Sequence, residues 1–440
     1  MTELKKTITL WKGVALAVCM VIGSGLLGLP GMTLEIGTVY SVAGGWLLMT
    51  IAAIPLIAVF ARLGLKFTSS AGLSKYAEEA VGPWGRHAVA SVLCGTFMLG
   101  IPAMAIIGGA YVQRFFGLQP GVVCWLSVAI LVLATSVNLM GVRAVNLINT
   151  ASLVALVSMM ILISVANFTL FSKGLIAVRD VALLSKDVAF GDVWRIATLL
   201  FWAFVGWENL SFSLEEFKRP EKSIPRVYWL SFIVVVCLYW GLTATSIGAE
   251  MSGVSVKGAS GLTALMASSP LGLFPLLILI LVIPANLNAW IFGASRLYFT
   301  SGRDGILPVF VGQLTRSGLP LNSLVCSLAA YIAVTLATHY LNVSLSMLVL
   351  LVNQNFLVLY AFSIYAYWKT ERGFRRWAVS ALAAGTCVFL LSGFSWWILY
   401  TIGLLVLGYG NYRRLKAQSC GKQTMLKQKE GEGWMLKRKS

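Results

Sequence analysis

Apolar runs of about 17–25 residues divide the sequence, and this is the length that a helix needs to cross the hydrocarbon core of a bilayer. Twelve such runs begin near residues 11, 40, 86, 121, 144, 196, 227, 271, 321, 343, 374 and 394. A soluble fold of 440 residues with 58% hydrophobic and 11% charged residues would have too little polar surface. We therefore expect an all-α integral membrane protein with 12 transmembrane helices.

The basic residues indicate an orientation, because cytoplasmic flanks carry the excess of Lys and Arg. With a cytoplasmic N-terminus, 28 of the 34 basic residues lie inside. The six left outside are Arg114, Lys173, Arg179, Lys186, Arg195 and Lys257. Both termini are thus predicted to be cytoplasmic, and the net charge of +18 needs no nucleic-acid partner. The basic tail after residue 412 is expected to lie on anionic membrane lipid, with a regulatory or partner-binding role as the alternative.

The residues that soluble enzymes use are sparse. Gly23, Gly25 and Gly28 form a GxGxxG match, but they interrupt an apolar run where a dinucleotide site would need a preceding strand. His87 and His339, the two histidines, fall on opposite predicted sides, which excludes a His-based metal site or a Ser-His-acid triad. We expect no cofactor, no metal and no enzymatic activity, and a membrane-embedded transferase is a minor alternative.

An acid interrupts the apolar run that begins near residue 196. Glu208 lies in the stretch 201–226, which ends in a charge-dense, Pro-bounded segment. A charge at mid-bilayer costs roughly 2.5–3.5 kcal/mol on insertion scales, so Glu208 is expected to face a cavity or a polar partner. Gly206 stands in the sixth run where Gly23 stands in the first, and interrupted helices at matching positions predict two inverted repeats. The alternative is that these glycines only allow close helix packing.

Unwound helices expose backbone amides and carbonyls inside the membrane. Such groups are tolerated where they line a cavity or meet a ligand, and the N-terminus of a half-helix carries partial positive charge. Gly23, Gly25 and Gly28, followed by Pro30, can unwind the first helix in this way. A zwitterionic solute would fit this geometry.

Four motifs together resemble the amino acid–polyamine–organocation (APC) transporter superfamily. They are IGSG at 22–25, FVGWE at 204–208, EFKRP to IPR at 216–226, and SRL to RDGILP at 295–308. The resemblance covers nearly the whole chain and is greatest to bacterial exporters of methionine and branched-chain amino acids. It implies a 5+5 inverted repeat with discontinuous helices 1 and 6, plus two C-terminal helices. The implied segments are a cytoplasmic N-terminus (1–10), helices 1–5 (11–170), an external loop (171–195), helices 6–10 (196–368), helices 11–12 (369–412) and a cytoplasmic tail (413–440).

The resemblance also implies which residues bind substrate. The substrate carboxylate would meet the amides of the Ile22-Gly23-Ser24-Gly25 motif. Its ammonium group would meet carbonyls near Phe201, Trp202 and Phe204, beside Gly206, although Trp202 could equally be a packing aromatic.

The third and eighth helices would supply the side-chain pocket. Asn286 and Trp290 lie four residues apart on one helical face and would line it, whereas Asn288 is rotated away. Interhelical hydrogen bonding is the alternative for Asn286. Met98, Ile101 and Met104 are further candidates if the third helix lines the pocket.

Glu208 matches an acid that in relatives supports the unwound segment or takes part in proton-linked gating. No basic or additional acidic residue is recognised on the predicted cavity helices, which argues against cationic substrates. We therefore expect a secondary transporter of small neutral or hydrophobic amino acids in the bacterial inner membrane, exporting by proton antiport. An importer, an exchanger, or a channel or receptor on the same fold are alternatives, and the oligomeric state is left open.

The charged segment 215–226 is expected to dock against other cytoplasmic loops. The candidate partners are Arg62, Lys66, Arg303 and Asp304. A solvated loop that only sets the topology is the plainer alternative.

Overall fold

The computed structural model is almost entirely helical. It describes residues 6, 8–22, 25–68, 72–140, 142–183, 188–267, 274–316, 318–393 and 396–437, with one isolated bridge and no strand within these ranges. The first half contains α1 (Leu10–Val21), α2 (Gly25–Leu34), α3 (Val39–Lys66), α4 (Leu73–Val81), α5 (Trp84–Phe115), η1 (Pro120–Val122), α6 (Val123–Leu139), α7 (Val142–Ala166) and α8 (Phe168–Ala182). The second half contains α9 (Phe190–Leu200), η2 (Phe201–Phe204), α10 (Trp207–Leu210), η3 (Ser211–Glu216), α11 (Pro220–Met251), α12 (Thr263–Ala267), α13 (Phe274–Arg303), η4 (Val309–Gly312), α14 (Leu321–Tyr340), α15 (Leu345–Thr370), α16 (Gly373–Leu391) and α17 (Ile398–Lys437).

Seven helices in the described ranges are long and apolar enough to cross a membrane. They are α3, α5, α6 with η1, α11, α14, α15 and α16. The bent pair formed by α7 and α8 would be an eighth. The other predicted runs overlap or adjoin α1, α9, α13 and α17. The seven clear spans confirm an apolar helical protein, while the run near residue 196 is divided among the shorter segments α9, η2 and α10.

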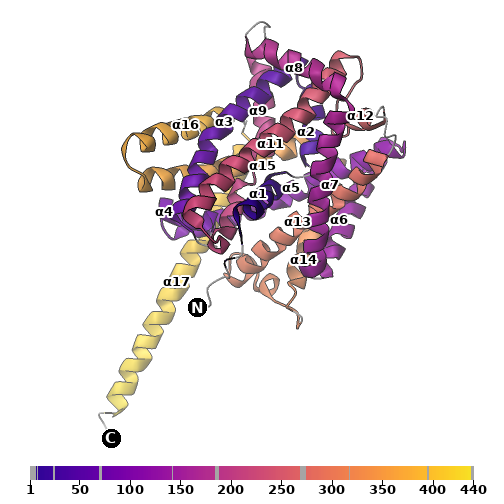
Figure 1. Ribbon diagram of the computed structural model, residues 1–440. Helices are drawn as coiled ribbons and strands as arrows, with labels where there is room; N and C mark the ends of the chain where they lie inside the picture. Colours follow the sequence, from indigo (N-terminus) through magenta and orange to yellow (C-terminus); the bar gives the residue numbers. More distant parts are fainter. Residues whose placement is uncertain are drawn as a thin grey trace.

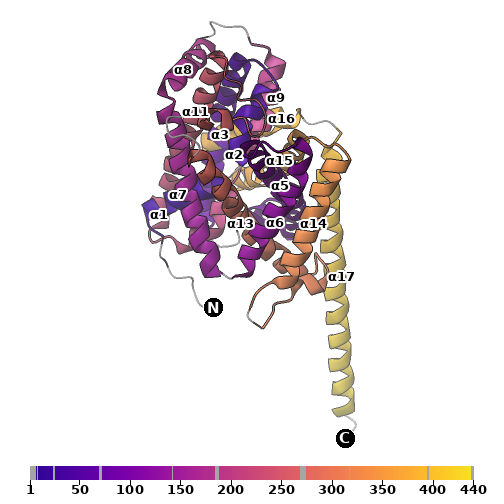
Figure 2. The same cartoon turned by 90° about the vertical axis from the view of Figure 1, so that its right-hand side faces the viewer.

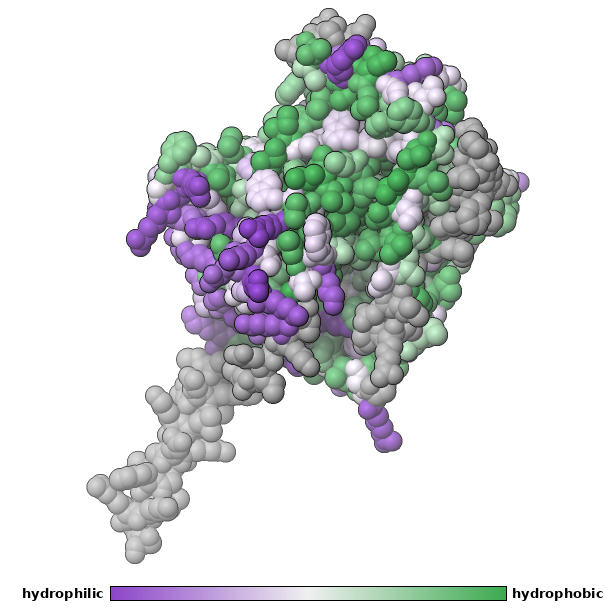
Figure 3. Space-filling model, viewed as in Figure 1, coloured by the Kyte–Doolittle hydropathy of each residue, from purple (hydrophilic) through white to green (hydrophobic). Residues whose placement is uncertain are grey.

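Two sides of the molecule can be told apart in Figures 1 and 2. Both chain ends lie on the side that carries α4, which we call the termini side, and α8 lies on the opposite side, which we call the α8 side. Figure 3 shows hydrophobic residues across the middle, with hydrophilic residues gathered around α4 and at the top beside α8. An apolar middle between two polar ends is the surface expected of a membrane protein.

Residues 171–195, which the sequence suggested as a loop, contain most of α8 and the start of α9. The axis of α8 turns by 86° from that of α7, and α8 packs against α11. Two glycines permit this contact, because a Cβ on Gly174 would lie 1.8 Å from Ala244 O and one on Gly248 would lie 1.8 Å from Leu170 O. The helix was hidden in the sequence by its charged residues Lys173, Arg179 and Asp180.

Helix boundaries differ from the sequence expectation at two further places. The helix expected near residue 227 begins at Pro220, where proline suits the first helical turn because it lacks an amide hydrogen. At the C-terminus, α17 continues to Lys437 and extends away from the other helices (Figures 1 and 2). The basic tail after residue 412 is therefore helical over most of its length.

Candidate functional site

The first helix break follows α1. Ile22, fully buried, leaves helical geometry with φ −78° and ψ 100°, while its amide still donates to Val18 O at 2.9 Å. The chain becomes helical again at Gly25, where α2 begins. Gly23 and Ser24, two of the predicted substrate-binding residues, lie outside the described residues. The first helix thus ends at the predicted motif, whereas Gly28 and Pro30, which the sequence suggested as part of the unwound stretch, lie inside α2.

The second helix break follows α9. Helix α9 tightens into η2, Val205 is extended, and Gly206 takes the left-handed conformation with φ +116° before α10 begins. A Cβ at Gly206 would lie 2.5 Å from Met20 O and 2.9 Å from Val21 Cα. Glycine is therefore needed twice, for its backbone angle and for its approach to α1. The two breaks touch each other at this point.

Side chains from distant helices satisfy carbonyls around the second break. Asn353 Nδ2 on α15 donates to Thr198 O at 2.7 Å and to Leu199 O at 3.2 Å. Tyr239 on α11 donates its hydroxyl to Ala203 O at 2.8 Å, and Tyr228 donates to Trp207 O at 3.3 Å. Buried carbonyls left without donors would cost free energy, so these three side chains stabilise the break. No motif in the sequence pointed to them.

Glu208 is fully buried just after the second break. Its Oε2 accepts hydrogen bonds from the Gly206 amide at 2.9 Å and from the Tyr360 hydroxyl at 2.7 Å. Its Oε1 takes no hydrogen bond from the described residues. The carboxyl group therefore links the backbone amide at the second break to the Tyr360 hydroxyl of α15.

The aromatic side chains of η2 lie mostly in the packed interior. Phe204 meets Tyr239 edge-on at 5.7 Å between ring centroids, and Phe201 meets Tyr360 at 5.6 Å. Phe201 and Phe204 are fully buried and Trp202 is 7% exposed. These contacts favour a packing role for their side chains and leave any substrate contact to the backbone.

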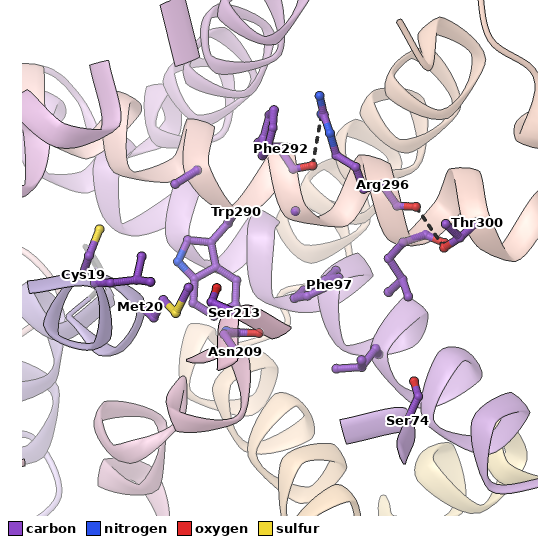
Figure 4. Close-up of a pocket in the computed structure, with 15 residues that line it drawn as sticks. Cys19, Met20, Ser74, Phe97, Asn209, Ser213, Trp290, Phe292, Arg296 and Thr300 are labelled. Carbon is purple, nitrogen blue, oxygen red and sulfur yellow. Dashed lines mark hydrogen bonds between the residues drawn. The ribbon is translucent and has the colours of Figure 1, made fainter. Parts of the chain in front are cut away.

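A cavity of about 700 Å³ lies on the termini side of the two breaks (Figure 4). Its walls come from the helices that precede the first break and follow the second, together with α4, α5 and α13. The lining residues are Leu16, Cys19, Met20, Ser74, Leu93, Phe97, Asn209, Ser213, Ala289, Trp290, Phe292, Gly293, Arg296, Leu297 and Thr300. Of the predicted site residues, Trp290 is in this set. None of the described lining residues is an acid.

The third helix contributes different residues from those suggested by the sequence. Phe97 and Leu93 line the cavity, and Phe97 meets Trp290 edge-on at 5.9 Å (Figure 4). Ile101 and Met104 are buried away from it, and Met98 is not among the lining residues. The orientation of a helix that is apolar on all faces cannot be read from hydropathy, which explains the error.

A stripe along α13 forms one wall of the cavity. Ala289, Gly293, Arg296 and Thr300 follow at steps of four, three and four residues, which places them on one helical face. The sequence expectation that cavity helices carry no basic residue is therefore wrong, because Arg296 is on this face. Its signal was the Ser295-Arg296-Leu297 motif, which was used for the resemblance and not for the site.

Asn288, which the spacing predicted to be rotated away from the pocket, is not among the residues that line the cavity. Asn288 is fully buried and accepts a hydrogen bond on Oδ1 from Asn138 Nδ2 of α6, 2.6 Å away. It thus links two helices and does not line the cavity. The side chain of Asn286 lies outside those that the structure describes.

Beyond the breaks, on the α8 side, the molecule is packed. The segment 252–262 lies against α2, where the Gly258 amide donates to Gly31 O at 3.1 Å. A Cβ on Gly31 would lie 2.1 Å from Gly258 O, so the two backbones are in direct contact. Glu250 holds the segment through the Val256 amide at 3.1 Å and Lys257 Nζ at 3.7 Å. The cavity and this packed segment are on opposite sides of the breaks.

The four candidate partners of segment 215–226 each have a contact with another group. Arg62 bonds Glu371 at 3.0 Å, Lys66 donates to Thr370 O, and Arg303 lies 3.9 Å from Asp304. In these contacts the candidate partners of segment 215–226 bind other groups, and the expected docking stays a prediction.

Segment 215–226 instead binds the N-terminal segment through the backbone. The Ile8 amide donates to Glu216 O at 3.0 Å, and the Lys218 amide donates to Ile8 O at 3.0 Å. The chain just before α1 is thereby attached to the chain just after η3.

Metal binding finds no support in the described ranges, where no group of three His, Cys, Asp or Glu residues is placed to share an ion. The geometry instead offers an apolar cavity beside two helix breaks, which is an arrangement suited to a small solute.

Comparison with known proteins agrees with this geometry. Residues 8–410 match the family model described as amino acid permease. The uncharacterized amino acid permease YecA of Bacillus subtilis is 26% identical over 92% of this chain and 95% of its own length. The L-methionine/branched-chain amino acid exporter YjeH of Escherichia coli is 23% identical over 92% and 96%, and the E. coli cadaverine/lysine antiporter is 25% identical over 73% and 72%. The chain therefore belongs to the amino acid permease family of the APC superfamily, as its motifs predicted.

Proposed function

We propose that this permease exports small neutral or hydrophobic amino acids, above all methionine and branched-chain amino acids, by alternating access driven by proton antiport. The observation that carries the proposal is the cavity beside the two helix breaks, whose described lining is mostly apolar and contains no acid. A dicationic polyamine would be placed in this cavity without a counter-charge. The similarity to an exporter of methionine and branched-chain amino acids supports the same class.

The proposal includes the full topology. Helices 1 and 6 would be the α1–α2 and α9–α10 pairs, in two repeats spanning 11–170 and 196–368, with helices 11 and 12 in 369–412. Segments 1–10 and 413–440 would be cytoplasmic and 171–195 external, in the bacterial inner membrane. The uneven distribution of basic residues and the position of both chain ends on one side of the molecule support this orientation.

Substrate would bind where the two breaks meet. Its carboxylate would contact the amides of residues 22–25, and its ammonium group would contact carbonyls of Phe201, Trp202 and Phe204 beside Gly206. Asn286 and Trp290 would border its side chain. The meeting of Gly206 with Met20 and the place of Trp290 in the cavity wall support this arrangement.

Proton coupling would pass through Glu208. The group is buried at the junction of α10 and α15, and one of its oxygens takes no hydrogen bond from the described residues. Protonation would change its hydrogen bonds to Gly206 and Tyr360, and the position of Gly206 determines how α10 meets α1. A proton could thereby alter the shape of the cavity wall.

The test follows the release of free amino acid from cells that lack or overproduce the protein, after loading with a methionine- or leucine-containing dipeptide. We expect protein-dependent acceleration of release that saturates with internal concentration. Glu208→Gln should bind substrate and fail to transport it, while Glu221→Gln, at an exposed position on the termini side, should behave as wild type.

Other outcomes assign other functions. Unchanged release by wild type would refute export, and uptake or counterflow by the same cells would then identify an importer or an exchanger. Flux that does not saturate would identify a channel. Normal export by Glu208→Gln would reduce Glu208 to structural support.

A further inference from the structure

Arg296 is the one charged side chain among the described residues that line the cavity. It lies on α13 six residues beyond Trp290, which is roughly 9 Å along a helix. It also lies seven residues before the end of α13 at Arg303, or roughly 10 Å. The guanidinium group is thus placed between the predicted side-chain pocket and the termini side.

No acid neutralises this guanidinium in the described part of the chain. Its Nη1 donates to Ser295 Oγ at 2.8 Å. It also donates to Phe292 O at 3.3 Å, as Figure 4 shows, and both acceptors lie on the helix that carries Arg296. Its Cζ lies 3.4 Å from the centre of the Phe292 ring. These contacts hold one edge of the guanidinium and use Nη1 alone, so the donors on Nε and Nη2 are left for another acceptor.

The neighbouring wall suits the rest of an amino acid. Leu93, Phe97 and Leu297 contribute apolar surface to the lining. Asn209 and Ser213, labelled in Figure 4, contribute polar atoms just after the second break. An apolar side chain could lie on the first group while a carboxylate meets the arginine. Arginine binds a carboxylate through two parallel hydrogen bonds. A ligand that carries an amide or an ammonium group in place of the carboxylate cannot accept this pair of bonds.

We propose that Arg296 binds the carboxylate of the transported amino acid on the termini side of the breaks, as a second carboxylate site distinct from the amides of residues 22–25. This inference rests on the proposed function and deepens it. The site selects amino acids over the amines that remain when their carboxylate is removed. It also disfavours diamines, because they bring two positive charges to an unpaired arginine.

The test measures binding to purified wild-type protein and to Arg296→Met, by competition with radiolabelled L-leucine. The competitors are unlabelled L-leucine and isoamylamine, which is leucine without its carboxylate. We expect Arg296→Met to reduce the leucine-to-isoamylamine affinity ratio by about tenfold or more, the effect of losing a hydrogen bond to a charged group. Arg296→Lys, which keeps the charge without the two-pronged geometry, should retain part of the ratio.

Arg303→Met is the matched control. Arg303 is on the same helix and also lies near an aromatic ring, with its Cζ 5.8 Å from the Phe299 centroid, but it is outside the cavity lining. Its variant should keep the wild-type ratio within about twofold. A ratio internal to each variant separates ligand selection from loss of folded protein, because misfolding weakens both competitors equally.

Two results would overturn the inference while leaving the proposed function intact. One is an unchanged leucine affinity in Arg296→Met. Arg296 would then contact no substrate and would only place its charged group near the membrane surface. The other is an equal loss for leucine and isoamylamine, which would make it structural. If wild type binds neither leucine nor methionine, the proposed function fails, and the inference fails with it.

Discussion

Glycine has opposite roles on the two sides of the helix breaks. On the α8 side, Gly31 lets α2 touch the backbone of Gly258, and a Cβ there would lie 2.1 Å from a carbonyl oxygen. On the termini side, Gly293 borders the cavity, and a Cβ there would meet nothing within 4 Å. Gly31 allows two backbone segments to pack in direct contact, whereas Gly293 leaves the cavity wall free of a side chain. The sequence positions alone do not distinguish these roles.

This difference corresponds to one state of an alternating-access cycle under the proposed function. Opening the α8 side would require separation of segment 252–262 from α2, and closing the termini side would require α1 and α10 to fill the cavity. The contact to be broken includes a single backbone hydrogen bond between Gly258 and Gly31. Such a bond contributes only about 0.5–1.5 kcal/mol, so it can be exchanged during a transport cycle.

The largest expected effect is that of Gly206→Ala at the junction of the two sides. The left-handed φ and the Cβ position 2.5 Å from Met20 O both oppose alanine. We expect a loss of roughly 2–4 kcal/mol in stability and loss of transport. Thermal unfolding in detergent would measure the first. Gly293→Ala, which is unhindered and helical, should unfold at or slightly above the wild-type temperature, and equal losses in both variants would contradict the comparison.

A smaller effect is expected from Gly31→Ala on the packed side. The new Cβ would displace segment 252–262 and favour the state that is open on the α8 side. A cysteine introduced at Ser260, which is 9% exposed, should then react faster with a membrane-impermeant maleimide. Gly28→Ala is the graded control, because its Cβ would lie 3.3 Å from Ala259 O, and it should accelerate labelling less. The same labelling rate in both variants would argue that close backbone contact at Gly31 does not keep the α8 side closed.

Tyr360→Phe tests how firmly the second break is held. The variant removes the hydroxyl that donates to Glu208 Oε2 and should cost about 1–3 kcal/mol in stability. Tyr331→Phe removes an equally buried hydroxyl that meets Tyr298 at a longer 3.4 Å, and it should cost less. Thermal unfolding of both variants would compare them. If Tyr331→Phe were the more damaging, the support assigned to Glu208 and Tyr360 would be wrong.

The smallest change in stability is expected from Glu78→Gln, on α4 at the termini side. The hydrogen bond from Arg86, 2.8 Å away, lowers the pKa of the Glu78 carboxyl below its ordinary value. Its stabilisation is therefore present above the unfolded-state pKa, near 4.3, and is lost as the pH falls through the lower folded-state pKa. Because the pair is exposed, Glu78→Gln should cost less than about 0.5 kcal/mol at pH 7.

Unfolding measured at pH 7 and at successively lower pH would check this prediction. The difference between wild type and Glu78→Gln should shrink as the pH falls. Glu216→Gln is the control, since Glu216 ends η3, lies in no first helical turn and has no side-chain ion pair among the described residues, so its difference should stay near zero. A difference that grows on acidification would have the wrong sign for a paired carboxylate.

The sequence predicted the features that depend on neighbouring residues. Apolar length predicted the long helices, and the glycines at 23 and 206 predicted the breaks, because both signals are local. It did not predict the donors Asn353 and Tyr239, which come from helices far along the chain and acquire their role only through packing. Arg296 was missed for the same reason, since the rotation of α13 decides whether it faces lipid, protein or the cavity.

The backbone bridge at Ile8 has a mechanical consequence. It attaches the outer end of α1 to the chain that follows α10, and the contact of Gly206 with Met20 joins the two helices at their inner ends. Because α1 and α10 are joined at both ends, a movement of one of them in the proposed transport cycle would carry the other with it.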